Sequence, residues 1–374
     1  MRFLIVGPIH HHDEYARAVR AAPPDQPPLF PPSQAHYFYV KALRALGCEV
    51  EAFHFTASVL FGGLELIRLS EFGGSLGGKV RAALPRFPRL SPEYRARNRR
   101  LVETARRLRP DVVWVVGGSN LILPETLAAL KALGATLMYS TGTSPVVFAL
   151  PNERKAARLF DLVVTNDFYH AVQWLELGAP RAEALPFTAC DPDMHHPYAL
   201  NPDEQQAYRC EVAFVGTLLP EALYSRRVRA LEALRDFDLG VWSVHPVPAS
   251  LQPFYRGKAL GETMLRVLCA ARIVVNPHGD FMRWGGNMRL FEASGCGVFQ
   301  IADDLPGIGH WFKVGEEIVT YRDPDHLRDL VKHYLAHDDA RRAIAAAGQA
   351  RAYADHTYRR RTEQLLAWLA ALRP

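Results

Sequence analysis

Short apolar runs alternate with amphipathic segments through the first half of the chain. The apolar runs are "RFLIVG", "EVEAFHF", "DVVWVVGG", "TLMYST" and "DLVVTN", and the segments between them include "SQAHYFYVKALRALG" and "PETLAALKALG". Strand-like runs separated by helix-like segments are typical of parallel strands joined by crossover helices. The pattern therefore predicts a doubly wound, Rossmann-like α/β domain.

The alternation stops over 184–206, a stretch of turn residues, and then restarts. "CEVAFVG", "DLGVWSV", "ARIVVNP", "GVFQIA" and "EEIVTY" predict a second parallel sheet. A chain of 374 residues is also too long for one ordinary core. We predict an N-terminal domain over 1–190, a linker over 191–205, a second domain over 206–356, and a C-terminal helix over 357–374 that could pack back on the first domain.

Two segments depart from this pattern. Residues 21–33, "AAPPDQPPLFPPS", carry six prolines and predict a long loop after the first strand, either a lid or a plain insert. Residues 79–109 carry eleven Lys or Arg against two acids, although the whole chain has a net charge of only +5. Such a segment is either a solvated helix face or a contact for a membrane surface or an anionic acceptor.

Composition narrows the class of protein. Hydrophobic residues make up 49% of the chain and charged residues 22%, as in soluble globular proteins. The apolar start is too short for a signal peptide and no later apolar run approaches ~18 residues, so we expect a cytoplasmic protein without an integral membrane segment. The five cysteines form no C-x-x-C pair, which indicates neither a disulfide framework nor a zinc site.

The strand exits exclude two common nucleotide-binding classes. The first strands of the two halves end in "IVGPIHHH" and "FVGTLLPE", so neither carries G-x-G-x-x-G or G-x-x-x-x-G-K-[ST]. This argues against a nicotinamide dehydrogenase and against an ATPase. Ligands bind at the carboxyl ends of parallel strands, so we expect a cleft between the two sheets.

The stretch "GGNMRLFEASGCG", from Gly285 to Gly297, predicts a short helix that starts at Asn287. Its first N–H groups, with Gly286 before them, suit an anion such as a diphosphate, and Arg289 could reach a phosphate oxygen. Glu292 lies farther along the helix, where a carboxylate could accept from both ribose hydroxyls. The alternative is an N-cap followed by an ordinary i,i+3 surface ion pair.

A resemblance favours the first interpretation. The stretches that carry it are "NPHGDFMRWGGNMRLFEASGCGVFQIAD", the region after it, "EVAFVGTLLPEALYSRRVRAL" and "ALPFTACDPDMHHP". They resemble the spore-maturation-protein type (CgeB-like) glycosyltransferases over about residues 160–374. The resemblance implies a GT-B fold, an acceptor on the N-terminal domain and a nucleotide-sugar donor on the C-terminal one. It also implies that Glu292 holds the ribose, that Asn287, Met288 and Arg289 lie under the diphosphate, and that Gly216 and Thr217 form the first glycine turn.

One position departs from the related retaining enzymes. They have a second Glu eight positions before the ribose-binding one, where this chain has Trp284. His278 and Asp280 are the polar residues nearby that could contact the sugar. Arg226 and Arg227 could neutralise the diphosphate or lie on the surface, and His196, with His195 before it, is a linker histidine that either faces the cleft or is merely solvated.

The acceptor side has one polar cluster, "HHHDEY", after the first strand. Adjacent residues of one loop rarely converge on an ion, so we expect no metal. His12, oriented by Asp13, is the predicted general base of an inverting transferase; in a retaining enzyme the two would only hold the acceptor.

These features together predict a metal-independent glycosyltransferase of the hexosyltransferase type, with no cofactor besides its nucleotide diphosphate-sugar donor. The alternatives are a nucleotide-sugar epimerase or hydrolase on the same scaffold, and a non-catalytic surface-assembly protein. The sequence does not indicate the sugar, the base or the acceptor.

Overall fold

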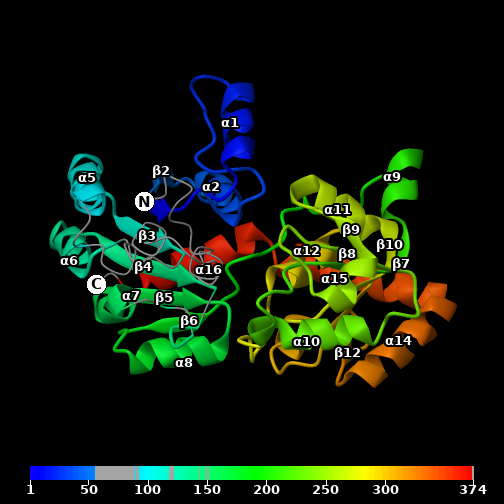
Figure 1. Ribbon diagram of the computed structural model, residues 1–374. Coiled ribbons are helices and arrows are strands. Elements are labelled where there is room, and N and C mark those ends of the chain that lie inside the picture. The colour runs from blue at the N-terminus through cyan, green and yellow to red at the C-terminus, as the bar shows by residue number, and fades with distance from the viewer. Residues whose placement is uncertain are drawn as a thin grey trace, which may run out of the picture. The chain divides into compact units, whose positions relative to one another are not determined.

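The computed structural model describes residues 1–54, 89, 92–117, 122–142, 144–147, 149 and 151–372. The chain forms two compact units, Met1–Phe187 with Thr362–Pro374, and Thr188–Arg361. Each unit contains one six-stranded parallel sheet with helices (Figure 1). The prediction of two doubly wound α/β domains is therefore confirmed. Of the basic segment over 79–109, residues 79–88, 90 and 91 lie outside the described residues.

The first unit has the strand order β2-β1-β3-β4-β5-β6, with every neighbouring pair parallel. Its strands are β1 (Arg2–Gly7), β2 (Glu49–His54), β3 (Val112–Val116), β4 (Thr136–Thr141), β5 (Leu162–Thr165) and β6 (Ala182–Ala184). Its helices are α1 (His12–Ala21), α2 (Ala35–Ala45), α5 (Pro92–Leu108), α6 (Pro124–Ala132), α7 (Pro151–Ala156), the 3-10 helix η4 (Ala157–Leu159), α8 (Phe168–Glu176) and most of α16 (Tyr358–Ala370).

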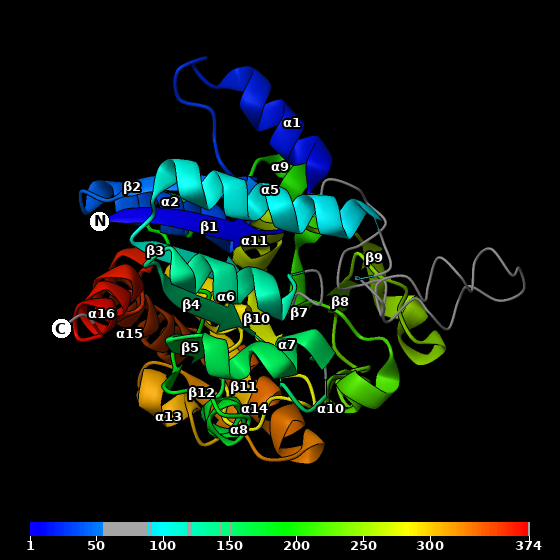
Figure 2. The same cartoon turned by 90° about the vertical axis from the view of Figure 1, so that its left-hand side faces the viewer.

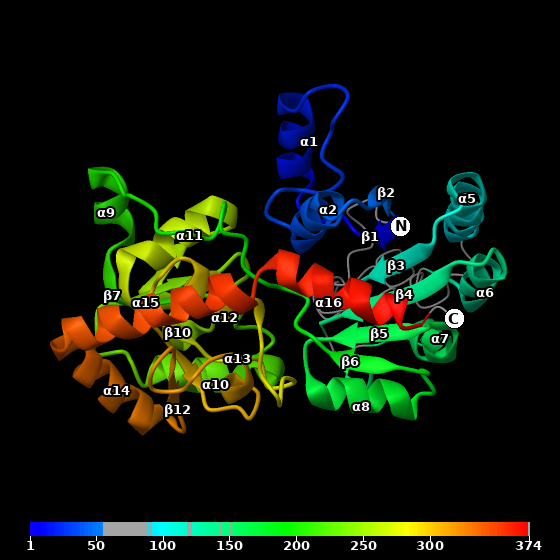
Figure 3. The ribbon, with the colours of Figure 1, turned by 180° about the vertical axis from the view of Figure 1, so that it is seen from behind.

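Alternate strand residues of the first unit form two layers of core. Leu4 and Val6 belong to the core cluster that α5, α6, η4 and α8 cover, and Figure 2 shows α5, α6 and α7 side by side. Trp114 points to the other face, where its ring meets that of Tyr39 on α2. Helix α16 crosses the sheet on this second face (Figure 3).

The second unit has the order β12-β11-β10-β7-β8-β9, again all parallel. Its strands are β7 (Cys210–Val215), β8 (Leu239–Trp242), β9 (Tyr255–Gly257), β10 (Ala271–Asn276), β11 (Gln300–Asp303) and β12 (Val319–Tyr321). Its helices are α9 (Pro202–Tyr208), α10 (Glu221–Glu232), the 3-10 helix η5 (Ala249–Phe254), α11 (Gly261–Ala270), α12 (Met288–Gly295), α13 (Ile308–Trp311), α14 (Pro324–Ala336) and α15 (Asp338–Asp355). Helices α10 and α14 cover one face of the sheet, and α11 and α12 the other.

Three features differ from the sequence-based expectations. The residues after β1 begin helix α1 instead of continuing as a loop, and the proline-rich segment follows that helix. The edge strands β6 and β9 have three residues each, too few for a recognisable apolar run. The stretch predicted as a linker, 191–205, lies within the second unit. No helix among the described residues is long and apolar enough to span a membrane.

Candidate functional site

The candidate site lies at the carboxyl edge of the second sheet, where its strand order reverses. Strand β7 comes first in the chain, β8 and β9 extend the sheet on one side, and β10 to β12 extend it on the other. The exits of β7 and β10 are therefore neighbours, and crevices at such switch points are where open α/β sheets bind ligands. Helix α12 starts beside these exits and carries three of the predicted donor residues, Met288, Arg289 and Glu292.

Asn287 caps helix α12 as predicted. Its side-chain oxygen accepts from the Leu290 N–H at 3.1 Å, and its amide nitrogen donates to Asn276 at 2.8 Å. Asn276 is the last residue of β10, so this bond ties the helix start to the strand exit. The N–H groups of Met288 and Arg289, the first two helical residues, have no acceptor within the helix. They remain the donors for an anion at this end.

His278 occupies part of the predicted anion site. Its Nε2 accepts from the N–H groups of Gly286 and Asn287 at 3.1 and 3.2 Å. Nδ1 therefore carries the proton and donates to Asp303 Oδ1 at 2.6 Å. His278 is fully buried and both of its ring nitrogens are bonded within the protein; its contact with the sugar stays a prediction. The Gly286 N–H is likewise used by this ring and not available to a phosphate.

Asp303 links His278 to helix α10. Its second oxygen accepts from Arg226 Nη1 at 2.9 Å. Burial alone would raise the pKa of Asp303, but the hydrogen bonds and attraction from His278 and Arg226 hold it at about 2. The carboxylate therefore stays charged and fixes the imidazole orientation. The sequence signal was the acidic pair that ends "VFQIADD", which follows a strand next to β10.

Asp280 also supports α10. Its carboxylate accepts from the backbone N–H groups of Ser225 at 2.7 Å and Arg226 at 3.2 Å, directly after the kink at Tyr224. It lies 3.8 Å from Arg226 Nε. Arg226 is thus bound to two carboxylates, and neither Arg226 nor Asp280 is placed as a free group for a diphosphate or a sugar.

Arg227 is held differently from its neighbour. Its guanidinium donates to two backbone carbonyls at the strand exits, Pro277 at 2.9 Å and Thr217 at 2.8 Å, and lies over the Tyr224 ring. Among the described residues no carboxylate forms an ion pair with it. Burial lowers its pKa. A methyl group on Gly216 would lie 2.9 Å from the Phe214 ring, so the packing of that ring favours glycine here, whereas Arg227, at 3.5 Å, would be in ordinary contact.

Glu292 and Arg289 form the i,i+3 pair expected from their spacing, at 2.5 Å. The pair is not on the surface, because only 12% of the Arg289 side chain and 10% of the Glu292 side chain are exposed. The Arg289 Nε is buried without a hydrogen-bond partner in the described structure. Electrostatic attraction reaches from Glu292 to His195, whose pKa is lowered by burial.

His195, and not His196, contacts helix α12. Its Nδ1 accepts from the Asp191 N–H at 2.8 Å, and a methyl group on Gly295 would lie 2.9 Å from its Cβ. His196 instead stacks on Tyr198, with ring centroids 4.4 Å apart. The two histidines are adjacent in the chain, so the sequence pattern alone could not tell which one packs on the helix.

Trp284, which stands where the sequence resemblance implies a second Glu, packs on the loop after β11. Its carbonyl accepts from the Gly307 N–H at 2.6 Å, and a methyl group on Gly307 would lie 2.4 Å from its ring.

His12 and Asp13 do not form the expected dyad in the first unit. They are consecutive residues in the first turn of α1, a helix with no buried residue. Neighbours i and i+1 on a helix point about 100° apart, so Asp13 does not orient His12. Within the described residues, no group of three or more His, Cys, Asp and Glu side chains is placed to hold a metal ion.

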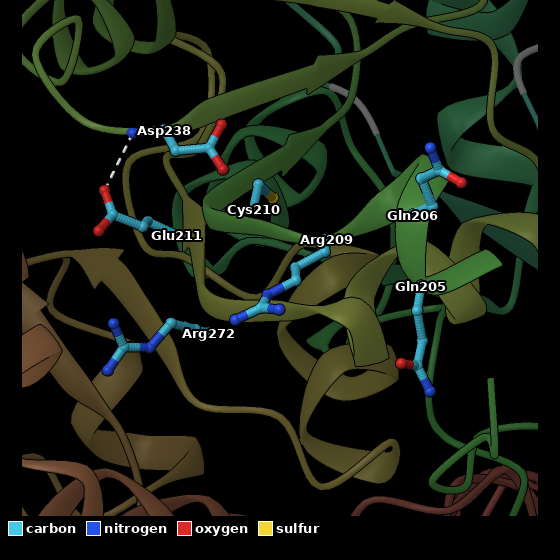
Figure 4. A pocket seen from close by; sticks show the side chains of 7 residues that line it. All are labelled: Gln205, Gln206, Arg209, Cys210, Glu211, Asp238 and Arg272. Atoms are coloured by element: carbon cyan, nitrogen blue, oxygen red, sulfur yellow. Dashed lines mark hydrogen bonds between the residues drawn. The ribbon is translucent and has the colours of Figure 1, made fainter. Parts of the chain in front are cut away.

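A separate pocket of about 400 Å³ lies at the opposite edge of the second sheet (Figure 4). Arg209 and Cys210 at the start of β7, and Arg272 at the start of β10, line it. The Asp238 N–H donates to Glu211 across it at 3.0 Å. It lies at the amino ends of the strands and contains none of the predicted site residues, so it does not belong to the candidate site.

The comparisons with known proteins agree with this architecture. Residues 225–367 match the family model described as "Glycosyl transferase-like". No curated protein matches the sequence. Among solved structures, Anabaena Alr3699/HepE in complex with UDP and glucose is similar, with 15% identity and a TM-score of 0.59 over 99% of this chain and 100% of that one.

Two further structures show the same likeness. Sucrose-phosphate synthase from Thermosynechococcus elongatus has 14% identity and a TM-score of 0.60, covering 99% of this chain and 100% of that one. A glycosyltransferase from Rickettsia africae ESF-5 has 12% identity and a TM-score of 0.62, covering 99% and 98%. At such identities the likeness establishes the fold, and over almost its whole length this chain has the two-domain GT-B fold of glycosyltransferases.

Proposed function

We propose that the protein is a glycosyltransferase that moves a sugar from a nucleotide diphosphate donor, bound by the second unit, to an acceptor. The family match over residues 225–367 supports this activity, and so does a fold shared with proteins solved with UDP. The CgeB-like type indicated by the sequence motifs is part of the same proposal. The observation that supports it most is that the guanidinium groups of Arg227 and Arg289 are incompletely compensated by the protein.

An anionic ligand would supply each arginine with an interaction that the protein does not provide: an opposite charge for Arg227 and a hydrogen-bond acceptor for Arg289 Nε. Among the described residues, Arg227 is a half-buried cation hydrogen-bonded only to carbonyl groups, and Arg289 has an unsatisfied buried Nε. A buried charge is costly unless an opposite charge compensates for it. Both belong to one electrostatic neighbourhood, because burial lowers the pKa of Arg227 and repulsion from Arg289 lowers it further. A diphosphate at the start of α12 would meet both guanidinium groups and the N–H groups of Met288 and Arg289.

The same geometry assigns roles during the reaction. The bond between the anomeric carbon and the phosphate oxygen breaks, a bond to the acceptor oxygen forms, and the acceptor loses its hydroxyl proton. Arg227 and Arg289 would stabilise the negative charge that develops on the departing diphosphate, without a metal ion. Glu292 would accept from the ribose hydroxyls with the oxygen that Arg289 leaves unused. His12 remains our proposal for the group that takes the acceptor proton.

Calorimetric titration with UDP, GDP, dTDP, CDP and ADP tests the proposal. We expect the wild-type protein to bind at least one of them. Arg227→Gln should lower that affinity by about tenfold or more, since a hydrogen bond to a charged group contributes ~1.5–3 kcal/mol. Arg229→Gln is the matched control, because Arg229 lies on the same helix and is exposed. Absence of binding to all five nucleotides, or equal affinity in the Arg227 variant, contradicts the proposal.

Donor turnover separates the alternatives. A transferase needs the acceptor, whereas an epimerase or hydrolase converts the donor alone. Steady conversion of a nucleotide-sugar by the purified protein at a rate that added acceptors do not increase would favour the epimerase or hydrolase. A surface-assembly protein without activity would bind no nucleotide.

A further inference from the structure

Helix α8 of the first unit exposes apolar side chains on its outer face. Phe168, Val172 and Leu175 recur at positions i, i+4 and i+7, and are 49%, 38% and 44% exposed. Tyr169, beside them, is 45% exposed. The inner face, with His170, Ala171 and Trp174, is already buried against the sheet. A surface helix that is apolar on both faces has an outer face suited to a second apolar surface.

A neighbouring turn extends this apolar surface. Val146 and Val147 are 61% and 53% exposed. Their backbone N–H groups both donate to Ser144 Oγ, at 3.2 and 3.3 Å. The same hydroxyl donates to Gln173 on α8 at 3.0 Å. These hydrogen bonds hold the turn against the helix. We call the surface formed by their six exposed side chains the α8 face; its residues are Val146, Val147, Phe168, Tyr169, Val172 and Leu175.

Basic side chains flank the α8 face. Arg154 on α7 donates to the carbonyls of Pro145 and Val146, both at 2.9 Å, so its charge sits beside the exposed turn. Lys155 and Arg158 are exposed on the same segment. Arg158 lies close to the end of α8, because a methyl group on Gly178, just after the helix, would be 3.9 Å from Arg158 Cβ. No ion pair with a carboxylate is recorded for these three cations in the described structure.

We propose that the α8 face docks on an anionic lipid surface. Apolar side chains on one helix face with basic residues beside them are typical of helices that lie in the membrane interface, where Phe and Tyr rings also gather. The uncompensated charges of Arg154, Lys155 and Arg158 complement anionic headgroups. A symmetric dimer through the same face would instead place these like charges opposite each other, which disfavours a second copy as the occupant.

Vesicle sedimentation with the full-length protein tests the proposal, using phosphatidylcholine vesicles with and without phosphatidylglycerol. We expect sedimentation with the anionic vesicles, weaker binding to the neutral ones, and loss of the difference at high salt. The triple variant Phe168→Ser, Val172→Ser, Leu175→Ser should lose at least about tenfold in vesicle affinity. The double variant Lys155→Glu, Arg158→Glu should lose the preference for phosphatidylglycerol.

Val19→Ser with Leu133→Ser is the matched control, because both residues are exposed apolar positions elsewhere in the first unit. This variant should bind vesicles as the wild type does. Equal vesicle binding by the triple serine variant would overturn the proposal, and so would a dimer in light scattering that the triple variant abolishes. A melting temperature well below that of the wild type would show that the face packs within the protein and would also overturn it. Nucleotide affinity should be the same in all variants, so this test is independent of the proposed activity.

Discussion

The start of α12 and the start of α1 both follow a strand and both carry polar residues, yet they are built differently. In α12, six of the eight residues are buried, and the preceding Gly286–Asn287 peptides are bonded to a buried histidine. In α1 no residue is buried, and its N-cap residue His11 makes no side-chain capping bond. Polar residues at a strand exit therefore become a fixed site only where buried partners from other strands hold them.

The largest effect expected from this difference is at Glu292. Glu292→Ala would remove the proposed acceptor for two ribose hydroxyls, and at ~1.5–3 kcal/mol for each bond the loss should be roughly 3 kcal/mol, on the order of a hundredfold in nucleotide affinity. Glu232→Ala is the matched control, since it breaks an i,i+3 Arg–Glu pair that is more exposed, where such pairs contribute under ~1 kcal/mol. Calorimetry on both variants provides the measurement, and unchanged affinity in the Glu292 variant would remove this residue from the site.

The second effect concerns His278, which accepts hydrogen bonds from the backbone just before α12. His278→Ala leaves two buried N–H groups without an acceptor, each at a cost of about 1–3 kcal/mol, so we expect a loss of roughly 3 kcal/mol in the free energy of unfolding. Urea denaturation measures it, and nucleotide affinity should fall in the same variant. His278→Gln should recover part of both, because its amide can accept and donate. If His310→Ala, at an exposed histidine, costs as much stability, the network around His278 has no special role.

The first unit also contains a buried histidine, His36, whose charge state should make stability depend on pH. Burial, with repulsion from His10 and His54, lowers the pKa of His36 from 6.5 to about 3. The unfolded chain takes up this proton below pH 6.5 and the folded chain does not, so the stabilisation is present above pH 6.5 and lost as the pH falls toward 3.

At pH 5 this linkage should cost about 2 kcal/mol relative to neutral pH. Denaturant unfolding at several pH values measures it. His36→Gln should flatten the acid side of the curve whatever its effect at neutral pH. Parallel curves for wild type and the His36 variant would show that His36 is not the linked group.

A smaller effect is expected at the polar cluster of α1 itself. His12→Ala and Asp13→Ala should each leave nucleotide affinity within about twofold, because neither belongs to the unit that carries the arginines, and exposed substitutions change free energies by about 0.5 kcal/mol or less. His12→Ala should slow transfer to the acceptor if this residue is the base. A large loss of nucleotide affinity in either variant would show that the start of α1, like that of α12, contributes to nucleotide binding.

No effect at all is expected from chelation. Arginines and backbone N–H groups would take the place of a metal ion at the diphosphate, so donor turnover should continue in EDTA. Activity that disappears in EDTA and returns with added Mn²⁺ or Mg²⁺ would show that the arginines do not suffice.

The sequence predicted the strands well because their signal is local. Ten of the strands are apolar runs that alternate with amphipathic helices, and each appears close to its expected place. The cap at Asn287 and the pairing of Arg289 with Glu292 were predictable for the same reason, since both depend on spacing within one helix. The roles of His278 and Arg226 were not, because both depend on Asp303, which lies at least 25 residues away in the chain.

Close packing at Gly295 has a consequence for sequence variation. A methyl group there would lie 2.9 Å from the Cβ atoms of both Cys190 and His195, and 3.1 Å from the His195 carbonyl oxygen. Any side chain would push α12, and Glu292 with it, away from the segment that carries His195. Distant homologues that keep this arrangement should therefore retain glycine at this position even where the residues around it have diverged, which makes Gly295 a marker for recognising them.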